Sequence, residues 1–196
     1  MRRDELMRVA LGLFGARGYR ATSVADIQRA AGLTGGSGAL YKHFPSKKDL
    51  LTTAIRQYVR GLGDSSSDLS TALPADPEAA LTMMSSAVLD AMAKDRDLIR
   101  IGLRDLDDVP DLQTELWDGL LASLYRELAS WIRTSDFPVA DPDATAAVLV
   151  ASLTYFRVLE ALIGHTPGDV DATAYQRAWV ASALATLGRQ DRATKS

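Results

Sequence analysis

The apolar residues of this chain recur with the period of an α-helix along nearly its whole length. No stretch alternates apolar and polar residues over the length of a β-strand. We therefore expect an all-α protein. Near the N-terminus the apolar residues share one helix face, with Gly18 as the stop. They are Leu6, Val9, Ala10, Leu13 and Phe14.

Capping signals divide the first part of the chain into short helices. Ser23 with Asp26, and Ser46 with Asp49, have the spacing of a capping box, which marks a helix N-terminus. Pro45 is expected to end the helix that precedes the second box. The three helices predicted after Gly18 run from Ser23 to Ala31, from Ala39 to Phe44, and from Lys47 to about Arg60.

A change of composition follows these helices. The segment GLGDSSSD at 61–68 is rich in glycine and serine, and we expect it to form a flexible joint. The sequence therefore predicts two domains, a small helical head at 1–60 and a larger antiparallel helical body at 61–196.

The body shows helix starts of its own. Asp76-Pro77 and Asp141-Pro142 each place a capping carboxylate before a proline. The helix after Asp141 is apolar on nearly every side, so both of its faces must be covered. Since the last helix is rich in alanine, we expect the last two helices to form a homodimer interface. Between the two starts, leucines recur every four residues at Leu112, Leu116, Leu120, Leu124 and Leu128.

Charge is distributed unevenly between the two predicted domains. Residues 1–60 contain eleven Lys or Arg and four Asp or Glu, a net charge of +7, whereas the remainder carries −10. A basic head on an acidic body predicts a polyanionic partner for the head alone. A chance fluctuation of surface charge is the alternative.

Several classes of site are not expected. The chain has no cysteine and only two histidines, far apart in sequence, which argues against disulfides and metal centres. It has no Ser-His-Asp order and no paired catalytic carboxylates. We therefore expect neither an enzyme nor a cofactor. The apolar stretch 144–156 ends at Arg157, too short to span a bilayer, so no membrane partner is expected.

Polar side chains gather in the head between residues 34 and 48, on and beside the predicted short helix at 39–44. Lys47 and Lys48 occupy the first turn of a helix, where a cation opposes the helix dipole. A phosphate partner would account for them. Hydrogen-bonding side chains suited to base edges and phosphates lie just before, at Thr34, Ser37, Tyr41, Lys42 and His43.

Within about residues 9–51 the sequence resembles the tetracycline-repressor (TetR) family. The matching runs are LGLFGARGYRATSVADIQRAAGL and ALYKHFPSKKDLL, which follow the family pattern of a GY-x-x-TS-x-x-DI segment, an AG turn and an LY-x-HF-x-SK segment. The resemblance implies a helix-turn-helix head that binds operator DNA, and a helical body that binds a small molecule and dimerises.

The resemblance also implies roles for individual residues. Tyr41 and Lys47 would bind phosphates, while Ser23 would cap its helix close to the DNA backbone. Two alternatives stay open, namely that Tyr41 packs beneath the short helix and that His43 is a structural hydrogen-bonder. The side chains that would face the groove are Thr34, Ser37, Lys42 and His43.

One segment departs from the family pattern. The run TGGSGA at 34–39 is two residues longer than the family commonly has. Its glycines allow close approach to DNA and weaken the start of the recognition segment. The sequence leaves open which of Thr34, Gly35, Ser37 and Gly38 reaches a base.

The resemblance implies a cytoplasmic repressor that a small-molecule effector releases from its operator. The alternatives are a ligand-responsive activator and a non-specific DNA-binding protein. An effector pocket would be lined by apolar and aromatic side chains with a few polar ones. The candidates, each of which is alternatively ordinary core, are Met83, Met84, Arg104, Trp117, Tyr125, Tyr155 and Phe156.

Overall fold

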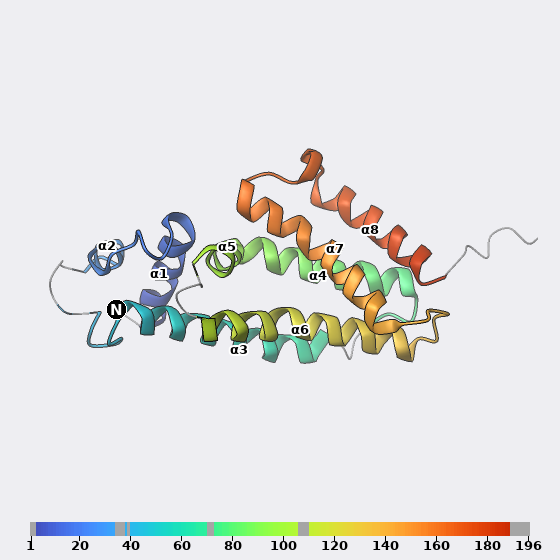
Figure 1. Ribbon diagram of the computed structural model, residues 1–196, viewed down its shortest axis with the longest axis horizontal. Helices are drawn as coiled ribbons and strands as arrows, with labels where there is room; N and C mark the ends of the chain where they lie inside the picture. Colours follow the sequence, from blue (N-terminus) through green and yellow to red (C-terminus); the bar gives the residue numbers. More distant parts are fainter. Residues whose placement is uncertain (1–2, 34–37, 39, 70–72, 106–109, 189–196) are drawn as a thin grey trace, which may run out of the picture. The chain divides into compact units, whose positions relative to one another are not determined.

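The computed structural model describes residues 3–33, 38, 40–69, 73–105 and 110–188, and every regular element in these ranges is helical (Figure 1). The predicted all-α class is confirmed. The helices are α1 (Arg3–Arg17), α2 (Val24–Ala30), α3 (Lys47–Leu69), α4 (Pro77–Lys94), α5 (Arg96–Arg104), α6 (Pro110–Thr134), α7 (Pro142–Ile163), the 3₁₀ helix η2 (Pro167–Asp169) and α8 (Ala172–Thr186).

The chain forms two compact units. The N-terminal unit comprises residues 1–65 and 95–120, and the C-terminal unit comprises 66–94 and 121–196. The N-terminal unit is therefore larger than the head expected from the sequence. It includes α5 because this helix packs against α1, where Leu98 and Ile101 join the same buried core.

The expected flexible joint at 61–68 is wrong, because α3 continues without interruption to Leu69. Once a helix has been nucleated, each added residue gains a hydrogen bond. A glycine in a helix interior costs only about 1 kcal/mol relative to alanine. Gly61 and Gly63 are therefore compatible with a helix that has already started at Lys47.

The expected short helix before Pro45 is also absent from the described residues. Residues 40–43 form a turn instead, in which the Phe44 N–H donates to the Leu40 carbonyl at 2.9 Å. On one side Gly38 has a left-handed backbone, with φ at +61°. On the other side Pro45 disfavours helical angles at the residue before it. Too few residues remain between them to nucleate a helix.

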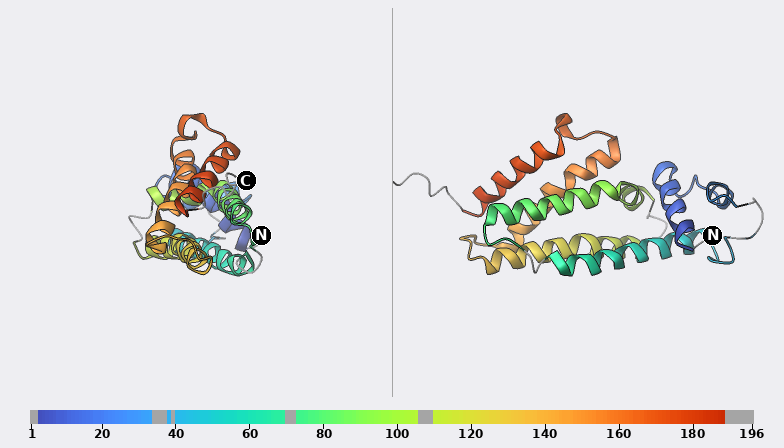
Figure 2. Two further views of the ribbon diagram at one scale, coloured as in Figure 1. Left: turned by 90° about the vertical axis from the view of Figure 1, so that its right-hand side faces the viewer. Right: turned by 180° about the vertical axis from the view of Figure 1, so that it is seen from behind.

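In the C-terminal unit α4 packs against both α7 and α8, and Figure 2 shows these three helices from two further sides. Both predicted helix starts are confirmed. The Asp76 carboxylate accepts from the Ala79 N–H at 2.9 Å, and the Asp141 carboxylate accepts from the Ala144 N–H at 3.0 Å. Each bond satisfies an N–H that has no partner within the helix.

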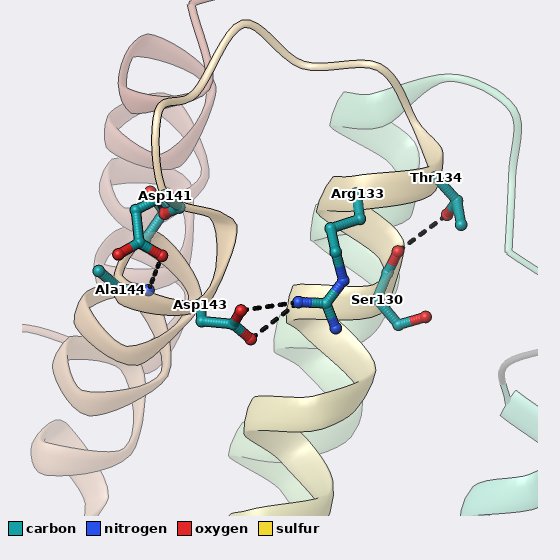
Figure 3. A network of polar contacts seen from close by, with 7 residues as sticks. Ser130, Arg133, Thr134, Asp141, Asp143 and Ala144 are labelled. Carbon is teal, nitrogen blue, oxygen red and sulfur yellow. Dashed lines mark hydrogen bonds and ion pairs between the residues drawn. The ribbon is translucent and has the colours of Figure 1, made fainter.

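An ion pair connects the end of α6 to the start of α7, beside the cap at Asp141 (Figure 3). Arg133 on α6 donates through one nitrogen to both carboxylate oxygens of Asp143 on α7, each at 2.8 Å. Both side chains are largely exposed, so this pair contributes little to stability.

The stripe of leucines on α6 serves two cores rather than one. Leu112 and Leu116 are buried in the core of the N-terminal unit. Leu128 is buried in the core of the C-terminal unit, with Leu124 packed against it. A single pattern in the sequence thus supplies two separate hydrophobic clusters.

Helix α7 keeps the unusual composition noted in the sequence. Over Pro142–Ile163 it is long and apolar enough to cross a membrane, by length and composition alone. Of its most apolar stretch, 39% is buried inside the protein, and the core helix of a soluble protein passes the same test. Four large apolar side chains of α7 are exposed, namely Val148, Tyr155, Leu162 and Ile163.

Candidate nucleic-acid interface and apolar cavity

Ser23 holds the start of α2 through both halves of a capping box, as the sequence predicts. Its hydroxyl accepts from the Asp26 N–H at 3.1 Å, and its own N–H donates to the Asp26 carboxylate at 3.0 Å. The hydrogen bonds from Ser23 hold the pKa of Asp26 below its usual value. Ser23 is exposed, so its hydroxyl lies at the surface of the head.

The turn before α3 exposes three polar side chains, which lie between two buried residues. Leu40 and Phe44 are buried in the core of the N-terminal unit. Between them Tyr41, Lys42 and His43 are all exposed. The Tyr41 ring is 57% exposed, so it is not packed beneath the turn. The arrangement brings a phenol, an ammonium and an imidazole to the surface side by side.

The other predicted contact residues of this segment are placed only in part. Gly38 lies within the described residues and adopts a left-handed conformation that suits glycine. Thr34, Gly35 and Ser37 lie outside the described residues, and their roles stay predictions.

Lys47 has structural contacts that the sequence reasoning missed. Its Nζ donates to the carbonyl oxygens of Tyr19 at 2.7 Å and Thr22 at 2.8 Å, and it lies 4.2 Å from the centre of the Tyr19 ring. These contacts tie the start of α3 to the loop between α1 and α2. Burial lowers the pKa of Lys47, because desolvation disfavours its charged form. An ammonium has three donors, so one remains for a phosphate.

Replacing Lys47 by alanine is therefore expected to destabilise the head as well as to remove a cation. We expect Lys47→Ala to lower the free energy of unfolding by about 1–2 kcal/mol, since two charged hydrogen bonds are lost. Lys48→Ala is the matched control, because Lys48 is the exposed neighbour on the same helix turn. Its effect should stay within about 0.5 kcal/mol in urea unfolding. Equal effects of the two variants would contradict a structural role for Lys47.

A cavity of about 290 Å³ lies in the C-terminal unit, between residues of α4, α6, α7 and α8. Its size is at the lower end of the range for small-molecule sites. Its lining is mostly apolar, with polar groups from three side chains besides the tryptophans. The lining residues are Leu73, Met83, Met84, Ala87, Val88, Leu124, Glu127, Leu128, Ser130, Trp131, Thr134, Val150, Leu153 and Trp179.

Two of the seven candidate effector residues, Met83 and Met84, line this cavity. Tyr125 packs against the core of the C-terminal unit without lining the cavity. Phe156 is buried and stacks on Tyr175 with ring centres 4.1 Å apart, and Tyr155 is exposed on α7.

The last two candidates are not in the C-terminal unit. Arg104 belongs to the N-terminal unit, where its guanidinium donates to the Gly15 carbonyl at 2.8 Å. Trp117 lies on α6 in the same unit, and its side chain is outside the described part of the chain.

Three cavity residues that carry distinctive chemistry were not among the candidates. Trp131 is half-buried three residues after the last leucine of the stripe, but its place in a cavity could not be anticipated from the sequence. Trp179 comes from α8, which no sequence signal connects to α6. Glu127 is exposed next to the buried Leu128, and partial desolvation raises the pKa of its carboxyl.

Comparison with known proteins identifies the head. The sequence model described as "Bacterial regulatory proteins, tetR family" matches residues 6–54. The HTH-type transcriptional repressor KstR2 of Mycolicibacterium smegmatis is 43% identical over 58 residues, which cover 30% of this chain and 27% of that protein. The match thus spans about a quarter of the relative's length. The match to the family model includes the turn with its exposed polar side chains.

Solved structures match over nearly the whole chain. The fatty acid degradation regulator FadR of Bacillus halodurans has a TM-score of 0.72 at 20% identity, covering 93% of this chain and 94% of that one. The transcriptional regulator FadR of Bacillus subtilis, solved in complex with stearoyl-CoA, has a TM-score of 0.70 at 16% identity, covering 93% and 97%. At these identities the likeness concerns the fold.

Proposed function

Because its N-terminal head belongs to the tetR family of bacterial regulatory proteins, we propose that this chain is a dimeric transcription regulator that binds operator DNA and responds to a small molecule. One observation carries the proposal. The turn after Gly38 exposes Tyr41, Lys42 and His43 from anchors buried in the core, within a segment of net charge +7. Lys42 and Tyr41 would contact phosphates, and His43 would read a base edge.

The homodimer would form through α7 and α8. The exposed apolar side chains on α7 need a cover that the monomer does not supply, and exposed alanines on α8, such as Ala178 and Ala181, allow close helix approach. A two-fold dimer presents two identical heads, which suits successive major grooves about 34 Å apart. We propose a second copy of the chain, and not a membrane, as the cover for α7. We accordingly place the protein in the cytoplasm.

The cavity of the C-terminal unit is the proposed effector site. An effector that binds one dimer geometry more tightly than another changes DNA affinity by linkage. The name of KstR2 as a repressor supports repression with release by ligand. The stearoyl-CoA complex of FadR supports a ligand with a long alkyl chain as one that this fold can hold. The relatives are regulators, and we propose no catalytic activity.

The DNA-binding half of the proposal is tested by fluorescence anisotropy. A duplex from immediately upstream of the protein's own gene is compared with a scrambled duplex at several salt concentrations. We expect sequence-selective binding that weakens as salt rises, because phosphate contacts release counterions. Lys42→Ala should weaken binding to every sequence and reduce the slope against salt by about 1.

The matched control is Lys94→Ala, which removes an equal charge from the exposed end of α4 in the C-terminal unit. It should leave DNA affinity and the salt slope unchanged. A second variant, His43→Ala, should reduce the difference in affinity between the upstream duplex and the scrambled duplex. Equal and weak binding to both duplexes, confirmed with genomic fragments, would reject a specific operator reader.

A further inference from the structure

We propose that the cavity of the C-terminal unit selects a lipophilic organic cation, such as an alkylammonium, whose charged group is held by the Glu127 carboxylate. The inference rests on the proposed function, in which this cavity is the effector site. It adds the chemical class of the effector. The argument comes from the charges and hydrogen bonds of the residues that line the cavity.

Glu127 dominates the electrostatics of the cavity. Of the fourteen residues that line it, eleven are apolar or aromatic, and Glu127 is the single ionisable one among these described residues. Its neighbour Arg126 acts on the Glu127 charge but is not part of the lining. A bound ligand with a positive group would therefore meet an opposite charge, whereas a carboxylate or phosphate would meet a like charge.

Two of the side-chain hydrogen-bond donors that line the cavity are already engaged. The Trp179 ring N–H donates to the Leu149 carbonyl at 3.1 Å and to the Ser152 hydroxyl at 3.0 Å. The Thr134 hydroxyl donates into its own helix, to the carbonyls of Ser130 and Trp131 at 3.0 and 3.1 Å. An anion needs donors, and these two groups have none to spare. Of the lining residues, Ser130 and Trp131 carry the other side-chain donors, so an anion would meet few donors beside the Glu127 carboxylate.

The apolar part of the lining suits the same class of ligand. Trp131 and Trp179 contribute indole rings, which attract cations more strongly than other aromatic side chains. Met83 and Met84 add polarizable thioethers on flexible side chains that adapt to an alkyl chain. Together with a carboxylate, these groups form the composition expected of a site for an ammonium ion on an apolar body.

Glu127 is exposed on α6, but partial desolvation beside the cavity still gives its carboxylate a reason to prefer a cationic ligand. This desolvation raises the pKa of Glu127, because the charged form loses some of its water there. A cation that enters the cavity restores a favourable partner for that charge. A neutral ligand of the same shape would not supply that partner.

The test uses the full-length protein and three probes that share a decyl chain: decyltrimethylammonium, decanol and decanoate. Binding is measured by titration calorimetry and by the fluorescence of the tryptophans, two of which line the cavity. We expect decyltrimethylammonium to bind roughly tenfold or more tightly than either of the others. Glu127→Gln should remove that preference and leave decanol binding within about twofold.

Asp90→Asn is the matched control, since Asp90 is an exposed carboxylate on α4 of the same unit and does not line the cavity. It should retain the preference for the cation. Equal or tighter binding of decanoate, unchanged cation binding in Glu127→Gln, or no binding of any probe would overturn the inference. The duplex titration is repeated on the same preparations. If one of these three outcomes is found and DNA binding is intact, only the proposed ligand class is rejected. If DNA binding is lost as well, the proposed regulator function is also rejected.

Discussion

Phe44→Ala is expected to lower the free energy of unfolding by about 3–5 kcal/mol, the usual cost of removing a fully buried phenylalanine. The Phe44 side chain is 1% exposed in the core of the N-terminal unit. Its N–H also closes the turn on the Leu40 carbonyl, and the Arg3 guanidinium lies 5.0 Å from its ring centre. The cavity left by the ring would loosen the turn that carries Tyr41. DNA affinity should therefore fall at least tenfold together with stability.

Tyr41→Ala separates the two effects, because this side chain lies on the same turn but is mostly exposed. It should weaken DNA binding while changing the free energy of unfolding by about 0.5 kcal/mol or less. Since the chain has two units, urea unfolding is read together with hydrogen exchange of the amides of α1 and α3. A loss of less than 1 kcal/mol in Phe44→Ala would show that the turn does not depend on this anchor.

Two glycines of α1 are expected to respond to alanine with opposite signs. At Gly15 an added Cβ would lie 2.4 Å from the Cβ of Asp97 on α5, a distance that real contacts essentially never show. Gly15→Ala should therefore destabilise the protein by about 1–3 kcal/mol, as overpacking does. At Gly12 nothing lies within 4 Å, so Gly12→Ala should stabilise the helix by about 0.5–1 kcal/mol.

The contrast tests whether α5 packs directly on the head. Both variants add the same methyl group to the same helix, so helix propensity cancels in the comparison and the contact with α5 remains. The Arg104 bond to the Gly15 carbonyl adds a second link at this point. Thermal unfolding of the two variants beside the parent chain is the measurement. Stabilisation by Gly15→Ala would mean that α5 does not approach α1 so closely.

The sequence predicted the features that depend on neighbouring residues. The capping box of Ser23, the cap at Asp141 and the stop at Gly18 each rest on hydrogen bonds or backbone angles within a few positions. The polar side chains Tyr41, Lys42 and His43 could be singled out from the sequence as candidate contacts, but the segment that carries them was predicted as a helix and forms a turn. Such short-range rules hold wherever the segment finally packs.

The failures arose where a local rule met a wider context. Gly61 and Gly63 suggested a joint, but a helix already nucleated at Lys47 extends through them. The sequence at 39–44 suggested a helix, but Gly38 and Pro45 leave too few residues between them to form one. In both cases the outcome was decided by what precedes and follows the segment, which composition over a short window does not report.

By itself, the sequence determined the all-helical class, most helix starts, the basic head and the cluster of polar side chains before Pro45, because helical period, caps and charge are read from adjacent residues. Only the tertiary structure decided that the leucines of α6 are shared between two cores and that Lys47 is bound by two carbonyls. It alone brought Glu127, Trp131 and Trp179 around one cavity. These are contacts between residues far apart in the chain, and they depend on how helices pack, for which a single sequence carries no local signal.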